Sequence, residues 1–223
     1  MTVATGQVVT LCGDGNIGSD DGTNNVASFN YPFGIASYVD PISLTDIIYV
    51  ADLYNHKIRR VQATSGVVTT LAGDGNAGLD DGTSSVASFN QPSGLGLSDD
   101  GAKLYVSTLG GSTIRAVATS TGIVKTVAGD GVAANDDGSS VTASFNMPMD
   151  MAFSIDSSRL YIAGGLSDHS IRILRPAPPP PSPPPPSPGV ALRALPREYQ
   201  ECVRPNLPTS ASHPRHALVR RVL

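Results

Sequence analysis

Short runs of β-branched and aromatic residues alternate with turn-forming residues along most of this chain. The apolar runs are four to six residues long and are separated by Gly, Asp, Asn and Ser, which is typical of strands joined by tight turns. The run at 58–61 alternates apolar and polar residues, which indicates one solvent-facing side, whereas the run at 47–51 is apolar throughout, as expected of a strand covered on both faces. No segment has a convincing 3.6-residue period, so the pattern predicts strands and no helix.

The predicted strands recur in sets of four. The phrase Ala27-Ser28-Phe29-Asn30 returns at 87–90 and 143–146, at steps of 60 and 56 residues. Four antiparallel strands in a repeat of this length are typical of a propeller blade, which buries its faces only against neighbouring blades. We therefore expect an all-β fold, a partial β-propeller of about three four-stranded blades. The predicted first strands are 33–36, 93–97 and 149–153, the second 47–51, 103–107 and 159–163, the third 56–61, 112–117 and 170–174, and the fourth 7–11, 67–71 and 123–127.

The fourth strands are out of phase with the other three. The stretch 7–11 precedes the first set, and the last set ends at its third strand, 170–174. Closed propellers need at least about four blades, so three arrangements stay open. The chain forms an open arc as a fragment of a longer propeller, or it packs onto a different propeller-containing chain. Alternatively it is half of a head-to-tail homodimer, a six-bladed ring in which each 7–11 strand completes the partner's third blade.

Composition divides the chain after the propeller region, residues 1–175. Residues 176–189 are a proline-rich linker of extended polyproline II type, and residues 190–223, which have no periodicity, are predicted to be disordered. Residues 1–175 contain 17 Asp and 9 Lys or Arg, a formal charge of −8, against +4 for the remainder. Nucleic acids and anionic membranes bind basic surfaces, so the acidic body argues against both as partners. The sequence shows no run of 18 apolar residues and no recognisable signal peptide.

Several segments resemble NHL repeats. Tyr49-Val50-Ala51-Asp52, Asn55-His56-Lys57-Ile58-Arg59, Thr70-Leu71-Ala72-Gly73 and the recurring Phe-Asn-x-Pro-x-Gly phrase are similar to the signature of this family. The second copy has Gly110-Gly111-Ser112-Thr113 at the Asn-His position, and the third keeps Asp168-His169. The resemblance covers about residues 6–175 and implies a β-propeller, usually of six blades. The proline-serine run also resembles the spacers of hydroxyproline-rich cell-wall glycoproteins of green algae and plants, which implies an extracellular or cell-wall setting.

An Asp-rich loop precedes the first strand of each set. These loops are expected to lie on one rim of the disc and to form an acidic ring suited to a cation or a basic partner. Oxygen-rich loops suit Ca²⁺, although their spacing does not match an EF-hand. Calcium is therefore the one cofactor that we consider, and the simpler interpretation is that Asp caps turns and Gly supplies positive φ. The candidate binding residues are Asp14, Asp20, Asp21, Asp74, Asp80, Asp81, Asp130, Asp136 and Asp137.

Two histidines, His56 and His169, occupy matching positions before the third strand of their sets. The NHL resemblance implies an alternative function, because some propeller enzymes of this type hold metal through channel histidines. These two residues would then serve a metal-assisted lyase or hydrolase. The simpler interpretation is that both histidines bond backbone groups between blades, because no Cys or Glu joins them and the second copy has no His there.

The remaining recurring residues favour structural roles. Arg59, Arg115 and Arg172 are expected to pair with aspartates or carbonyls across blades, and the recurring Phe to fill the gap between blades. Cys12 is interpreted as a small apolar residue without a disulfide to Cys202. Nucleophile-elbow, Walker and zinc-protease motifs are absent from the sequence. We therefore expect a non-catalytic NHL-repeat β-propeller scaffold that binds a protein or a ligand.

Overall fold

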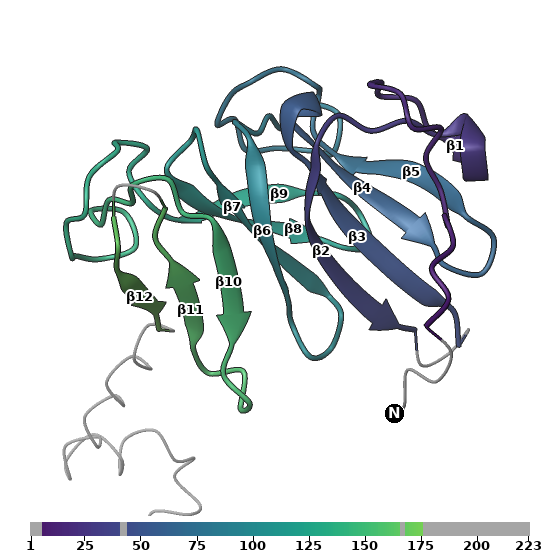
Figure 1. Cartoon of the computed structure of the whole chain (residues 1–223). Coiled ribbons are helices and arrows are strands. Elements are labelled where there is room, and N and C mark those ends of the chain that lie inside the picture. The colour runs from purple at the N-terminus through teal and green to yellow at the C-terminus, as the bar shows by residue number, and fades with distance from the viewer. Residues whose placement is uncertain (1–5, 41–43, 166–167, 176–223) are drawn as a thin grey trace, which may run out of the picture. The chain divides into compact units, whose positions relative to one another are not determined.

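The computed structural model describes residues 6–40, 44–165 and 168–175. Within these ranges the chain is built of antiparallel strands, and its only helices are two 3₁₀ turns, η1 (Asn24–Val26) and η2 (Leu53–Asn55). The all-β fold predicted from the sequence is confirmed (Figure 1). The helices found here are far too short to cross a lipid bilayer. The proline-rich linker and the tail lie outside the described residues.

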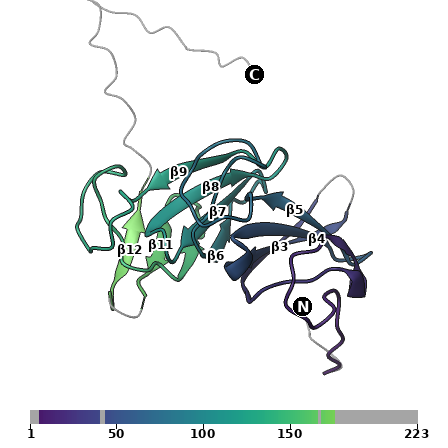
Figure 2. The same cartoon turned by 90° about the horizontal axis from the view of Figure 1, so that it is seen from above.

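Three sheets lie side by side as successive propeller blades (Figures 1 and 2). The first strands of the three blades are neighbours, with β6 lying between β2 and β10. Blade 1 contains β2 (Pro32–Val39), β3 (Asp46–Asp52), β4 (Lys57–Gln62) and β5 (Val67–Ala72). Blade 2 contains β6 (Pro92–Leu97), β7 (Lys103–Thr108), β8 (Thr113–Ala118) and β9 (Val124–Ala128). Blade 3 contains β10 (Asp150–Phe153), β11 (Leu160–Ala163) and β12 (Ile171–Leu174).

A fifth, short strand extends blade 1 at its outer edge. β1 (Gly22–Thr23) belongs to the Asp-rich loop that leads into blade 1, and it pairs with β5 at Val67–Val68. Gly82 of the next loop forms the corresponding bridge to Val124 on β9. Each of these two loops therefore runs along the outer edge of the blade that it enters, which the strand pattern alone did not indicate.

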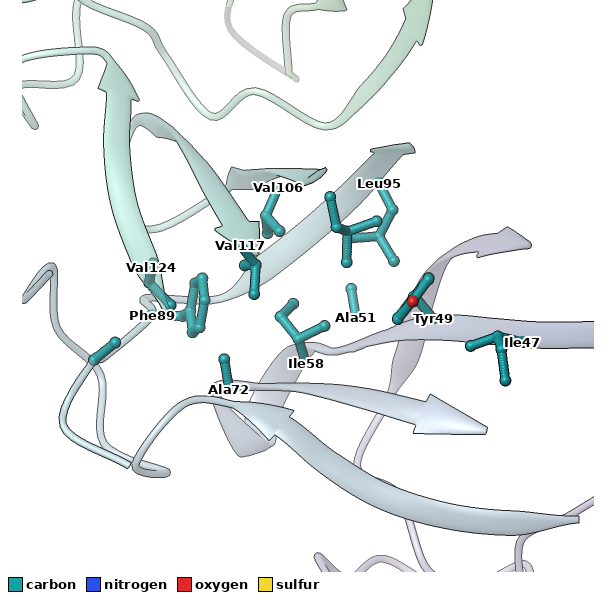
Figure 3. Close-up of a cluster of buried hydrophobic side chains, with 12 residues drawn as sticks. Ile47, Tyr49, Ala51, Ile58, Ala72, Phe89, Leu95, Val106, Val117 and Val124 are labelled. Atoms are coloured by element: carbon teal, nitrogen blue, oxygen red, sulfur yellow. The ribbon is translucent and has the colours of Figure 1, made fainter. Parts of the chain in front are cut away.

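The core consists of apolar side chains that pack between blades. In the larger cluster, Ile58 and Ala72 of blade 1 meet Phe89 and Leu95, which belong to the loop and first strand of blade 2 (Figure 3). Phe145 and Met151 repeat this contact against Ile114 of blade 2. The expectation that the recurring Phe fills the gap between blades is therefore confirmed for Phe89 and Phe145. These contacts remove apolar surface from water, and each Å² buried stabilises the fold by about 25 cal/mol.

Neighbouring blades approach most closely at their first strands. A Cβ on Gly34 would lie 2.0 Å from the backbone oxygen of Ser93, and one on Gly94 would lie 2.5 Å from the Cα of Asp150. Only glycine permits these approaches, which explains the glycine that follows Pro-x in the first two copies. The third copy has Asp150 at this position, and its side chain is exposed.

Residues 7–11 do not form the strand that the sequence predicts. These residues are described, but they form no strand in the single chain. A strand needs a hydrogen-bonded neighbour, and the neighbour here would be the third strand of a preceding blade. Cys12, at the end of this stretch, is half-buried and packs against the small apolar cluster of blade 1 that contains Val61 and Val68. Burial raises the pKa of the Cys12 thiol, against the opposing effect of the Arg59 charge.

Candidate functional site

The first aspartate of each Asp-rich loop closes a tight turn. Asp14 Oδ1 accepts a hydrogen bond from the Asn16 backbone N–H at 2.9 Å, and Asp74 and Asp130 accept the equivalent bonds from Asn76 and Val132. The backbone hydrogen bond from Asn16 is the main cause of a lowered pKa at Asp14, and the Asn76 side chain is the main cause at Asp74. All three aspartates are nevertheless exposed, so each loop presents a carboxyl group in a fixed position.

The second aspartate holds the loop against its own return segment. The Asp20 backbone N–H donates to Ser28 Oγ at 2.9 Å, and Ser28 Oγ lies 3.3 Å from Asp20 Oδ2. Asp80 with Ser88 and Asp136 with Ser144 repeat both contacts. The recurring Ala-Ser-Phe-Asn phrase therefore includes the serine that fixes the loop.

The third aspartate forms an ion pair with the recurring arginine. The Nη2 atoms of Arg59, Arg115 and Arg172 each lie 2.7 Å from a carboxylate oxygen of Asp21, Asp81 and Asp137 respectively. Each arginine also donates to two backbone carbonyls of the same loop and lies over its phenylalanine ring. The arginine thus binds the loop that enters its own blade, and the prediction that its partner is an aspartate or carbonyl of a neighbouring blade is corrected.

In blades 1 and 2 the fourth strand completes this ion pair. The Thr70 backbone N–H donates to Asp21 Oδ2 at 2.9 Å, and the Thr126 N–H donates to Asp81 Oδ2 at 3.0 Å. Burial opposes ionisation of both aspartates, but the hydrogen bonds from these threonines and arginines hold the pKa of each carboxyl below its ordinary value. In blade 3, where the described residues provide no fourth strand, the Asp137 side chain is 94% exposed, against 46% and 48% for the other two.

The two candidate histidines lie in equivalent turns between the second and third strands. Both have a left-handed backbone, with φ of 56° and 52°, as does Ser112 at the same position of blade 2. His56 Nδ1 accepts a hydrogen bond from the Gln91 backbone N–H at 3.2 Å, so it links blade 1 to blade 2. Burial lowers the pKa of His56, and the nearby Asp74 carboxylate opposes that shift. His169 is exposed. Within the described residues, no three His, Cys, Asp or Glu side chains are grouped closely enough to hold a metal ion.

Blade 1 contains a buried ion pair that the repeat pattern did not indicate. Asp52 and Arg59 are both fully buried, and Asp52 Oδ2 lies 2.7 Å from Arg59 Nη1. Asp52 also accepts hydrogen bonds from the Asn30 backbone N–H and the Asn55 side chain. The corresponding residue in blade 2 is Thr108, so the signal that could have revealed this pair was a departure from the repeat.

An exposed aromatic cluster on blade 1 was also missed. The rings of Tyr31 and Tyr54 are 5.3 Å apart, and those of Tyr31 and Phe33 are stacked at 6.4 Å. All three side chains are exposed. Blade 2 has Gln91 and Ser93 at the positions of Tyr31 and Phe33, so comparing the copies position by position would have identified these residues.

The sequence is similar to curated NHL repeat-containing proteins over part of its length. It is 40% identical over 90 residues to NHL repeat-containing protein 2 from Bos taurus, which is 40% of this chain and 12% of that protein. It is 35% identical over 98 residues to the chloroplastic Protein SUPPRESSOR OF QUENCHING 1 from Arabidopsis thaliana, which is 44% of this chain and 9% of that protein. The matched region thus spans about a tenth of these relatives. No family model matches the chain.

Solved structures show the same fold at low sequence identity. An auxiliary nutrient binding protein from Bacteroides thetaiotaomicron superposes with a TM-score of 0.52 at 19% identity, over 66% of this chain and 43% of that one. A related protein from Bacteroides ovatus gives 0.51 at 22% identity, over 63% and 37% respectively. The three described blades are therefore part of a β-propeller fold, and part of their sequence is similar to NHL repeat-containing proteins.

Proposed function

We propose that this chain is an NHL-repeat β-propeller segment that acts as a non-catalytic binding scaffold. Its contact surface is the first half of each Asp-rich loop, residues 13–18, 73–78 and 129–134, which we name the acidic rim. The partial sequence similarity to NHL repeat-containing proteins supports the scaffold. Its partner is a basic protein segment.

The observation that carries this proposal is the threefold repetition of an exposed, locally fixed carboxylate. Asp14, Asp74 and Asp130 take the same position on three successive loops. Asn55 Nδ2 donates to the Gly18 backbone oxygen, so the loop of blade 1 is also held against the turn after β3. A rigid array of like charges attracts a cationic partner and loses little entropy when it binds.

The test is calorimetric titration of the whole chain with an arginine- and lysine-rich peptide and, separately, with CaCl₂. In the variant, Asp14→Asn, Asp74→Asn and Asp130→Asn are combined. Asparagine keeps the oxygen that closes each turn and removes the charge. We expect peptide affinity to fall by about tenfold, since exposed ion pairs contribute ~0.2–1 kcal/mol each.

The matched control carries the same charge change at the opposite end of the strands. Asp46→Asn, Asp99→Asn and Asp156→Asn each lie at or beside the turn between the first and second strands of a blade. Equal weakening by both triple variants would reduce the effect to net charge and contradict the acidic rim. If the chain binds calcium tightly and the rim variant abolishes that binding, the ligand of the acidic rim is a cation and not a basic protein segment.

A further inference from the structure

Blade 3 carries an open slot beside β12. A groove of about 400 Å³ runs along Ile171–Leu174 and is closed on its other side by Asp137, Ala143 and Phe145. In blades 1 and 2 the equivalent space is occupied by the fourth strands, β5 and β9. Asp137 lines this groove. In the other two blades the equivalent aspartate accepts a hydrogen bond from a threonine N–H of the fourth strand.

The segment that fits this slot is described elsewhere in the chain. Residues 7–13, Gln-Val-Val-Thr-Leu-Cys-Gly, match 67–73 and 123–129, which place Thr10 at the position of Thr70 and Thr126. Val8 is 97% exposed, whereas its counterparts Val68 and Val124 are 1% and 0% exposed. The chain therefore contains both a stretch with the sequence of a fourth strand, whose Val8 is uncovered, and a blade with space for such a strand.

The faces of the terminal blades are complementary in the same way. Ile171 on blade 3 is 70% exposed, although the equivalent Ile58 and Ile114 are fully buried against the next blade. Ile35 on blade 1 is 67% exposed, although the equivalent Leu95 and Met151 are 6% and 7% exposed against the preceding blade. Blade 3 thus lacks a following blade to cover Ile171, and blade 1 lacks a preceding blade to cover Ile35. Blade 1 of another copy could cover the first, and blade 3 of another copy the second.

We propose that two copies of this chain associate head to tail, with residues 7–12 of each copy added to β12 of the other as the fourth strand of blade 3. The Thr10 N–H and hydroxyl then donate to Asp137, and Val8 enters the core of blade 3. Two identical junctions give six blades, within the usual range of four to eight for closed propellers.

The test is the solution mass of the full chain by light scattering at tens of micromolar. We expect twice the 23.0 kDa chain mass. Val8→Asp and Thr10→Pro should each give a monomer that keeps the circular dichroism of the three sheets and loses only the signal of the added strand, because both residues lie outside the sheets of the single chain. The matched control, Ile155→Asp, places the same charge on a fully exposed turn of blade 3 and should remain dimeric.

A folded wild-type monomer would overturn the proposal, and so would a Val8→Asp dimer or an Ile155→Asp monomer. A large, polydisperse assembly would overturn the two-copy ring. Hydrogen exchange supplies an independent measurement, since residues 7–12 and 171–174 should be protected together and in a concentration-dependent way. A dimer that leaves either segment unprotected would show that the strand is not added. None of these results depends on the acidic rim, whose variants are expected to remain dimeric.

Discussion

At the scale of single residues, the buried arginine organises each complete blade. Arg115 is fully buried, and its two Nη atoms reach two loop carbonyls and Asp81 while its guanidinium lies over Phe89. A planar group with several fixed donors can satisfy this set, and a lysine ammonium cannot. The sequence identified Arg and Asp as recurring partners, but the loop geometry that brings them together depends on contacts that no local pattern encodes.

Arg115→Lys should therefore destabilise the protein by about 2 kcal/mol, the scale of lost hydrogen bonds to a charged group. The cause is that Asp81 and two loop carbonyls lose part of their donor set, while the cation that replaces the guanidinium stays at a fully buried position. Urea unfolding followed by circular dichroism measures this free energy. The control is Arg159→Lys on an exposed residue, and a comparable loss there would contradict the structural role of Arg115.

The ion pair also predicts a pH dependence. The pKa of Asp81 is lowered in the folded protein, so its contribution to stability is complete above the unfolded value near ~3.9 and is lost as pH falls through the folded value. Wild type should therefore exceed Asp81→Asn in unfolding free energy at pH 5, and the difference should shrink towards pH 2.5. The control, Asp99→Asn, changes an exposed aspartate in the turn after β6. A pH-independent difference for Asp81→Asn would contradict the prediction.

At the scale of elements, the positions of the strands were predictable, but which segments pair with the outer edge of each sheet was not. The predicted strands at 47–51 and 103–107 correspond to β3 and β7 within one residue at either end, because β-branched and aromatic residues favour a covered strand. Residues 7–11 form no strand in the single chain, because strand formation requires a hydrogen-bonded partner and a sequence pattern does not reveal whether one is present. The pairing of Gly22 with Val68 was likewise hidden, since it joins a loop to an edge far along the chain.

The close approach of β6 and β10 gives a test at this scale. A methyl on Gly94 would meet the backbone of Asp150 and Met149 at 2.5 and 2.6 Å, so the two blades would have to separate. We expect Gly94→Ala to cost about 1–3 kcal/mol in unfolding free energy, as overpacking does. Gly96→Ala is the matched control on the same strand, because its methyl meets the Met151 side chain, which can move. An equal cost for both would contradict the importance of the backbone approach.

At the scale of the whole molecule, the repeat predicted what lies between blades and left open what lies beyond them. Phe89 and Phe145 are sealed by a blade on either side, whereas Ile35 and Ile171 face outwards at the two ends of the arc. An apolar residue has the same pattern in the sequence whether its partner belongs to the same chain or to another. The eleven described strands of the three blades, β2 to β12, were therefore predictable from the sequence, and the state of association was not.

The innermost position of blade 3 limits how tightly two copies can close. Gly34 and Gly94 allow the first strands of successive blades to touch, but Asp150 carries a side chain at the equivalent place. If two copies form the ring, blade 3 of one meets blade 1 of the other with that side chain between them. The junction between chains is then wider at its centre than the junctions within a chain.

Asp150→Gly should consequently strengthen association. Removing an overpacked side chain recovers about 1–3 kcal/mol, which lowers the dimer Kd by about 5- to 150-fold. Dilution series by light scattering or analytical ultracentrifugation measure this constant. Ala152→Gly is the control, because it removes a methyl and adds the same backbone freedom on the same strand without changing the close approach. If Asp150→Gly associates more weakly and Ala152→Gly is unchanged, Asp150 contacts the partner copy favourably. The close approach seen at Gly34 and Gly94 would then not apply to the junction between chains.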